Sequence, residues 1–280
     1  MSKQWTAVIK SKNKLFDLKL KEVFTYKDLI MLSVQRNLKT KYKQTILGPL
    51  WFIIQPLFTT IMHTFVFGNI AGLPTDGIPQ FLFYMAGNVP WAYFALCFTG
   101  TSNTFVDNAA VFGKVYFPRL TTPIATVITG MLNFLVQFLM FLGFIVYFMI
   151  KGADVHITYL AALTPILILQ MAILGMGFGI IVSSMTTKYR DLQVFVSFSV
   201  SLWMYATPVI YAPSTLSPKL YGFIMLNPMS PIIELMRYGW LGAGTNPLFY
   251  WGISWITTIA VLFLGIIMFN RVEKTFMDTV

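Results

Sequence analysis

Charged residues are scarce in this sequence. Only 11% of its 280 residues are charged, against about a quarter in an ordinary soluble domain, while 56% are hydrophobic and 16% are aromatic. The chain has one cysteine, Cys97, and two distant histidines, His63 and His156. A disulfide framework and a cysteine-based metal site are therefore excluded, and the composition is typical of a membrane protein.

Catalytic and energy-coupling motifs are scarce as well. The ten acidic residues form no local pair of the kind that acid–base catalysis needs, and no G-x-x-x-x-G-K-[ST] loop for nucleotide phosphates occurs. Ion-driven transporters usually carry an ionisable residue at mid-membrane, where this chain offers only His63. A lone histidine on an apolar helix is more often a packed residue. We expect no catalytic site, metal or cofactor on this chain, and a partner that supplies energy.

Six long segments contain no Asp, Glu, Lys or Arg. Each has the length, about 20 residues, that crosses a hydrocarbon core of about 30 Å, and apolar runs without alternation are typical of helices. We therefore predict an all-α integral membrane protein. Within the fourth segment, small residues at 175, 177 and 179 are expected to let helices approach closely. The predicted spans are residues 50–69, 81–106, 120–150, 159–187, 192–212 and 248–270.

Basic residues are concentrated at one end of the chain. Eleven of the 20 Lys and Arg precede Leu50, which argues against a nucleic-acid surface. With both termini in the cytoplasm, 17 basic residues lie inside and only three outside, namely Lys151, Lys219 and Arg237. This asymmetry predicts the orientation of a multi-pass protein in the cytoplasmic membrane. The first 20 residues lack the apolar region of a cleavable signal peptide.

Two further segments lie outside the spans. Residues 26–49 are predicted to contain an amphipathic interfacial helix, since apolar residues recur every four positions and basic residues lie on another side. Residues 214–246 are apolar, but Asn227-Pro228 and Pro231 divide them into pieces too short to cross. We expect two short outer helices there that enter the membrane and return. Residues 1–25 form a basic extension without an assigned role, and 271–280 form a cytoplasmic tail.

A series of short motifs extends over residues 26–275. They are KY at 41–42, LGPLW at 47–51, QP at 55–56, DGIP at 76–79, AG at 86–87, PW at 90–91, KVYFPR at 114–119, YRD at 189–191, TPVIY at 207–211, NPM at 227–229, Glu234, Arg237 and Gly242. In this order and spacing, the chain resembles the permease subunit of ABC transporters that export polysaccharides, a group that includes O-antigen, capsule and teichoic-acid exporters.

The resemblance implies a homodimer docked on two copies of a separate ABC ATP-binding subunit, which would hold ATP and Mg. Hydrolysis there would drive a lipid-linked polysaccharide from the inner to the outer face. The family's coupling elements map onto residues 26–44 and 107–119. The alternatives are a lipid anchor for the helix, ordinary positive-inside placement for the loop, and a tight turn for residues 189–191. The candidate coupling residues are Arg36, Lys39, Lys41, Tyr42, Asp107, Lys114, Tyr116, Arg119, Tyr189, Arg190 and Asp191.

The outer segment corresponds in the resemblance to gate helices, with Asn227, Pro228, Glu234 and Arg237 as candidate gate residues. Glu234 and Arg237 are three positions apart and can pair on one helix face. Such a pair either holds a gate or simply satisfies its own charges, and we favour the structural interpretation.

Aromatic side chains are the candidate lining of a glycan path, because sugars present flat C–H faces that stack on rings. The alternative is that these residues pack between helices or lie at the membrane interface. The candidates are Trp51, Phe58, Tyr84, Trp91, Tyr93, Phe94, Trp203, Tyr205 and Tyr211.

The predicted function is the membrane-spanning subunit of an ATP-driven exporter of a lipid-linked surface polysaccharide, of O-antigen or capsule type. A teichoic-acid exporter is the alternative within transport. An energy-independent membrane scaffold or lipid scramblase is the alternative from another class.

Overall fold

The computed structural model describes residues 20–42, 47–115, 117–189 and 191–279, and every regular element within them is helical. The all-α prediction is confirmed. The α-helices are α1 (Leu20–Thr25), α2 (Lys27–Tyr42), α3 (Trp51–His63), α4 (Gln80–Ser102), α5 (Thr104–Asp107), α6 (Ala109–Phe112), α7 (Thr121–Ile150), α8 (Thr164–Thr186), α9 (Leu192–Tyr205), α10 (Pro218–Met225), α11 (Met229–Leu241) and α12 (Leu248–Thr279). Shorter helical turns are η1 (Gly48–Leu50), η2 (Thr64–Ile70), η3 (Tyr159–Leu163) and η4 (Pro213–Thr215).

Within the described residues, five helical segments are long and apolar enough to cross a membrane, and they correspond to five of the six predicted spans. The other predicted span, 192–212, contains α9, whose 14 residues cover about 21 Å at 1.5 Å per residue. This is shorter than a hydrocarbon core of about 30 Å, so the number of six spans stays a prediction. The five segments are Gly48–Ile70, Gln80–Ser102, Thr121–Ile150, Tyr159–Thr186 and Leu248–Glu273.

Helix α4 forms the centre of the bundle. It packs against α3, α7, α8, α9 and α11, and α8 in turn packs against α12. Most of α4 is buried within this single chain, whereas most residues of α3 are not. A helix that is apolar on all sides is expected at the inside of a bundle, and α4 therefore places its side chains against every neighbouring layer.

Glycines allow α8 to lie close to both of its neighbours. A Cβ atom on Gly175 would lie 2.7 Å from the Cβ of Cys97 on α4, and one on Gly177 would lie 3.1 Å from the backbone nitrogen of Leu262 on α12. The prediction that these small residues let helices approach closely is confirmed.

Gly179→Ala is expected to lower the amount of folded protein in the membrane several-fold. The added methyl group would overlap Thr101 and would lie 2.8 Å from the carbonyl oxygen of Phe98, and overpacking of this kind costs about 1–3 kcal/mol. The measurement is membrane abundance together with the melting temperature of the purified protein. Gly143→Ala on α7 is the matched control, because a Cβ there meets no atom within 4 Å. Equal abundance of the two variants would contradict the prediction.

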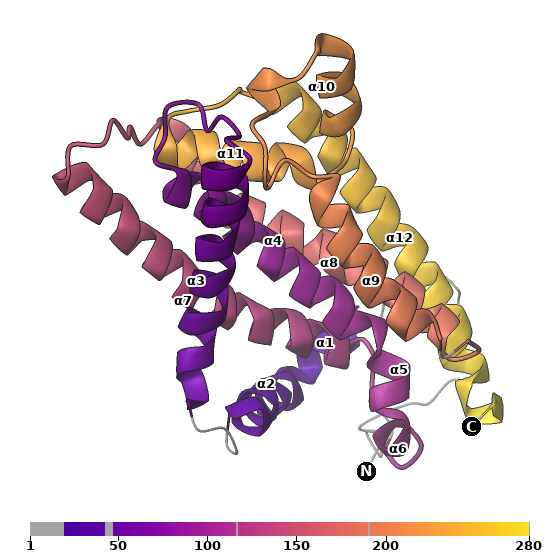
Figure 1. Ribbon diagram of the computed structural model, residues 1–280. Helices are drawn as coiled ribbons and strands as arrows, with labels where there is room; N and C mark the ends of the chain where they lie inside the picture. The colour runs from indigo at the N-terminus through magenta and orange to yellow at the C-terminus, as the bar shows by residue number, and fades with distance from the viewer. Residues whose placement is uncertain (1–19, 43–46, 116, 190, 280) are drawn as a thin grey trace.

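The two ends of the bundle differ in what they carry. In Figure 1, α2, α5, α6 and the C-terminal end of α12 lie at the lower end, and α10 and α11 lie at the upper end. Segments that the charge distribution predicts to be cytoplasmic thus share one end, and the predicted outer segment lies at the other. Helix α4 ends at Ser102, before the predicted limit at 106, and α5 follows after Asn103.

The predicted outer segment contains two short helices, α10 and α11, with the break between them at Asn227-Pro228, and their entry into the membrane stays a prediction. The amide of Asn227 donates to Thr207 Oγ1 at 2.8 Å, which fixes this break to the segment after α9. The prediction that Pro231 also divides the segment is wrong. Pro231 lies in the first turn of α11, where a missing N–H removes no intrahelical hydrogen bond.

Candidate functional site

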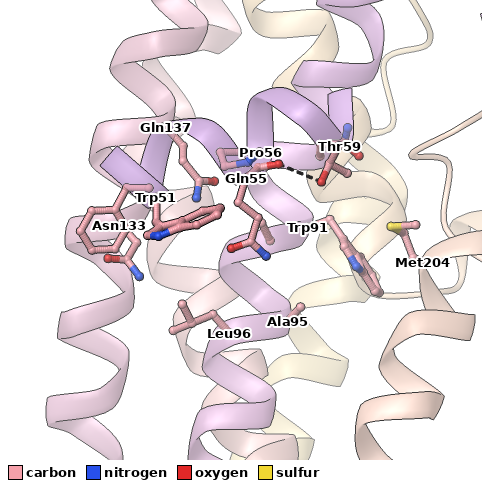
Figure 2. A pocket seen from close by; sticks show the side chains of 13 residues that line it. Trp51, Gln55, Pro56, Thr59, Trp91, Ala95, Leu96, Asn133, Gln137 and Met204 are labelled. Carbon is pink, nitrogen blue, oxygen red and sulfur yellow. Dashed lines mark hydrogen bonds between the residues drawn. The ribbon is translucent and has the colours of Figure 1, made fainter. Parts of the chain in front are cut away.

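A cavity of about 500 Å³ lies between α3, α4 and α7, with a wall residue from α9. Figure 2 shows its side chains, with Gln55 extending from α3 and Asn133 and Gln137 from α7. All of the lining positions belong to predicted membrane spans, and none of them is charged. The lining residues are Trp51, Phe52, Gln55, Pro56, Thr59, Asn88, Trp91, Ala92, Ala95, Leu96, Asn133, Gln137 and Met204.

The lining combines aromatic rings with carboxamides. Trp51 begins α3 and Trp91 lies midway along α4, so the two indoles reach the cavity from different helices. Asn133 and Gln137 are four residues apart and share one face of α7. Each carboxamide offers hydrogen-bond donors and an acceptor without carrying a charge. The cavity can therefore bind hydroxyl groups and stack on flat apolar faces.

A buried ion pair lies in α11, between the predicted gate residues Glu234 and Arg237. Arg237 Nη1 donates to Glu234 Oε2 at 2.9 Å, and Nη2 donates to the carbonyl oxygen of Pro208 at 2.9 Å. The guanidinium carbon also lies 3.8 Å from the ring centre of Phe83 on α4. Glu234 Oε1 accepts from the backbone N–H of Thr245 at 2.9 Å. The pair therefore ties α11 to α4, to the segment after α9 and to the segment before α12.

Both side chains of this pair are fully buried. Burial raises the pKa of the Glu234 carboxyl above its ordinary value, and the guanidinium of Arg237 works against that rise. The candidate gate residues Asn227 and Pro228 lie at the start of α11, and Ser254 on α12 donates to the carbonyl oxygen of Pro228 at 2.7 Å. The geometry brings all four candidate gate residues into one structural unit, and their role in gating stays a prediction.

A second cavity, of about 450 Å³, lies between α2, the junction of α4 and α5, and α7, at the end of the bundle opposite to α11. It brings together two predicted coupling residues, Arg36 and Asp107. Burial raises the pKa of the Asp107 carboxyl. Val34 on α2 is buried, and α2 packs against α7.

The other predicted coupling residues separate into two kinds. Those at 39, 114, 189 and 191 are exposed, whereas Arg119 is almost fully buried. Arg119 Nη1 donates to the carbonyl oxygen of Glu273 on α12 at 2.9 Å, and its guanidinium carbon lies 5.5 Å from the ring centre of Phe112. Residues Tyr116 and Arg190, and the side chains of Lys41 and Tyr42, lie outside the described residues. Coupling by any of these residues stays a prediction.

The family model described as ABC-2 type transporter matches residues 28–241 of this sequence. The chain belongs to the ABC-2 type transporter family. An O-antigen export system permease protein, RfbA, from Klebsiella pneumoniae is 29% identical over 252 residues, which cover 90% of this chain and 94% of that protein. An RfbA protein from Myxococcus xanthus is 29% identical over 78% of this chain and 80% of its own length. The polysialic acid transport protein KpsM of Escherichia coli is 21% identical over 87% of this chain and 93% of its length.

Membership of the ABC-2 family and the apolar helices identify a multi-pass inner-membrane permease. The family normally works with an ATP-binding subunit. Helices α2, α5 and α6, which carry or adjoin predicted coupling residues, lie at one end of the bundle (Figure 1), and docking of such a subunit there stays a prediction.

The predicted aromatic candidates occupy several different environments in this ABC-2 permease. Trp51 and Trp91 line the cavity. Phe94 and Trp203 pack behind Trp91, with their ring centres 5.4 Å apart, and Tyr84 and Tyr93 are buried in the core. Phe58 and Tyr205 are exposed on the outside of the chain, and Tyr211 is half-buried.

Sequence reasoning missed the carboxamides of the cavity. Asn88, Asn133 and Gln137 were not among the candidates, and Gln55 was noted only as part of a motif. The available signal was polarity inside charge-free spans, since an amide in an apolar helix is costly unless it has a partner. The spacing of Asn133 and Gln137 already predicts a shared helix face.

Proposed function

We propose that this ABC-2 permease is the membrane-spanning subunit of an ATP-driven exporter that moves a lipid-linked polysaccharide from the inner to the outer face of the membrane. The observation that carries the proposal is the cavity of rings and carboxamides between α3, α4 and α7. Such a lining suits a polymer of hydroxyl groups and flat C–H faces. The relatives named as O-antigen export permeases over most of the chain support the same function.

The energy for export comes, in this proposal, from a separate ABC ATPase. This sequence contains no phosphate-binding loop of the P-loop type, whereas its predicted cytoplasmic segments are rich in Lys and Arg. We propose that α2 and the segment 107–119 receive the ATPase movement. Both are connected directly to helices that line the cavity, because α2 packs against α7 and α5 follows α4.

A second copy of the permease completes the path in this proposal. Helix α3 contributes five residues at positions 51–59 to the cavity, yet most of the span that contains it is not buried within this single chain. Large apolar side chains on α3, η2 and α9 are exposed, among them Phe58, Phe65 and Phe198. A homodimer would bring two such faces together in a closed, two-fold arrangement. Six spans per copy, with α9 as the short fifth span and both termini cytoplasmic, are part of the same proposal.

Depletion of this permease is expected to remove most of one surface polysaccharide while the lipid-linked polymer accumulates inside the cell. An inactive ATPase, with alanine in place of its P-loop lysine, should give the same phenotype because both subunits act in one transport cycle. The measurements are surface labelling of the polymer and extraction of the intracellular lipid-linked pool. The purified complex should contain two copies of each subunit. An unchanged surface polymer after depletion of a stably expressed permease would refute the export function.

A further inference from the structure

The cavity between α3, α4 and α7 has an uncharged lining, which the export function alone does not require. Its side-chain polar groups are four carboxamides, the Thr59 hydroxyl and two indole N–H groups, and none of the lining residues that the structure describes is ionisable. The six predicted spans contain no Asp, Glu, Lys or Arg at any position. In a homodimer the second copy would bring the same neutral surfaces. From the described residues, a polymer in this part of the path therefore meets dipoles and rings but no countercharge.

Asn133 is the residue that points most directly to a ligand. It is 4% exposed, it lines the cavity, and its Oδ1 atom is buried without a hydrogen-bond partner among the described residues. Buried polar groups in proteins normally have partners. A hydroxyl group that enters the cavity would supply the donor that a carboxamide oxygen lacks.

The position of Asn133 is fixed by the packing of α7 on α4. A Cβ atom on Gly130, one turn earlier, would lie 2.6 Å from Leu96 Cδ2 and 3.3 Å from Tyr93 Cε2. The absence of a side chain at Gly130 lets α7 approach α4 at this level. Asn133 and Gln137 then follow on the face of α7 that turns toward the cavity.

Asn88 extends the same polar surface from α4. Its Nδ2 donates to Thr60 Oγ1 at 3.3 Å, and Thr60 Oγ1 donates to the carbonyl oxygen of Pro56 at 2.9 Å. The amide is thus held in place by a contact with α3. Carboxamides reach the cavity from three different helices, so a sugar ring between the indoles can contact several of them.

An anionic repeat would be poorly accommodated in this lining. Moving a carboxylate or phosphate from water into an apolar environment is costly unless a cation pairs with it. The buried cation of the outer helices, Arg237, is already paired with Glu234 and packed on Phe83. A phosphate of the lipid carrier would cross once per polymer, whereas every repeat unit passes the cavity, so the lining acts mainly on the repeat.

We propose that this cavity is a binding subsite for uncharged sugar residues, and that the permease selects polymers whose repeat units carry neither carboxylate nor phosphate. The proposal rests on the export function proposed above. Hydroxyl groups of the sugar donate to the carboxamide oxygens and accept from the amide N–H groups, while the rings of Trp51 and Trp91 stack on the sugar faces. Polysialic acid and teichoic-acid chains, which carry a charge in each repeat, are excluded as substrates.

Substitutions at Gln137 test this subsite in intact cells that carry the full transporter. Gln137 is half-buried, so a carboxylate tolerates the position better than it would at Asn133. Gln137→Glu retains the shape and an acceptor, and it is expected to keep at least half of the surface polymer per permease molecule. Gln137→Leu and Asn133→Leu remove the carboxamide and are expected to lower export about fivefold each, the effect of one hydrogen bond. Gln193→Leu on α9, outside the cavity, is the matched control and should export normally.

An anionic substrate would give the opposite order. Gln137→Glu would then block export by repulsion and Gln137→Leu would be tolerated, and this result would overturn the proposal. Chemical analysis of the polymer that disappears on depletion provides the second measurement. A repeat without uronic acid, sialic acid or phosphate supports the subsite, and one such group in every repeat overturns it. Whether the repeat is neutral or charged, loss of the surface polymer on depletion still supports the export function. The chemical analysis therefore tests the subsite separately from export.

Discussion

Arg237→Met is expected to remove most of the folded permease from the membrane. The substitution leaves Glu234 fully buried without its 2.9 Å partner and releases the carbonyl oxygen of Pro208. Breaking a buried ion pair by removing one partner costs about 3–5 kcal/mol, which is a large part of the stability of an ordinary domain. The measurement is membrane abundance at equal synthesis, together with the melting temperature of the purified protein.

The double variant Arg237→Met with Glu234→Gln separates loss of the pair from an isolated buried charge. We expect it to recover much of the abundance, because a neutral amide at position 234 still accepts from the Thr245 backbone N–H. Lys219→Met is the control, since it also replaces a cationic side chain with methionine, but at an exposed position near the same end. A single Arg237→Met variant that is as abundant and as heat-stable as the wild type would contradict the structural role. Recovered abundance without recovered export would add a role in gating.

The main features of the fold were predictable because they depend on the cost of burying charge. Segments without Asp, Glu, Lys or Arg correspond closely to the five long apolar helices, and the glycines of α8 mark the close helix contacts. The position of the break at Asn227-Pro228 was also predictable, because proline restricts the residue before it. The error at Pro231 has the same physical origin, since proline is well tolerated in the first turn of a helix.

The cavity was less predictable because it is a property of three helices together. Aromatic residues were sought along single segments, yet Trp51 and Trp91 line the cavity while Phe94, three residues after Trp91, lies in the core. Periodicity assigns residues to a face, but it does not say which neighbour that face meets. The four carboxamides are far apart in the sequence, and only the packing of α3, α4 and α7 brings them to one cavity.

Lys114→Glu and Arg119→Glu are expected to fail in different ways, although both reverse one charge in the same inner segment. Lys114 is exposed in the turn after α6, so its reversal leaves the fold intact and should weaken docking and coupling of the ATPase. Arg119 is buried against Phe112 and holds the carbonyl oxygen of Glu273. Its reversal places a carboxylate against a carbonyl oxygen and is expected to abolish folding. Abundance, co-purification of the ATPase and ATP hydrolysis by the complex are the three measurements.

The comparison of the two positions distinguishes a docking surface from a structural contact. Lys114→Glu should be as abundant as the wild type but should bind less ATPase. The amount of ATPase that Lys114→Gln binds should lie between the amounts bound by the wild type and by Lys114→Glu, because a contact between surface charges depends on charge and is screened by salt. For Arg119, even the conservative change to Lys should lower abundance, since an ammonium group does not reproduce the planar guanidinium packed on the ring of Phe112. Full ATPase binding and export by Lys114→Glu would remove this residue from the coupling surface. The exposed Lys39 and Asp191 would then be the remaining described candidates for charged contacts outside the second cavity.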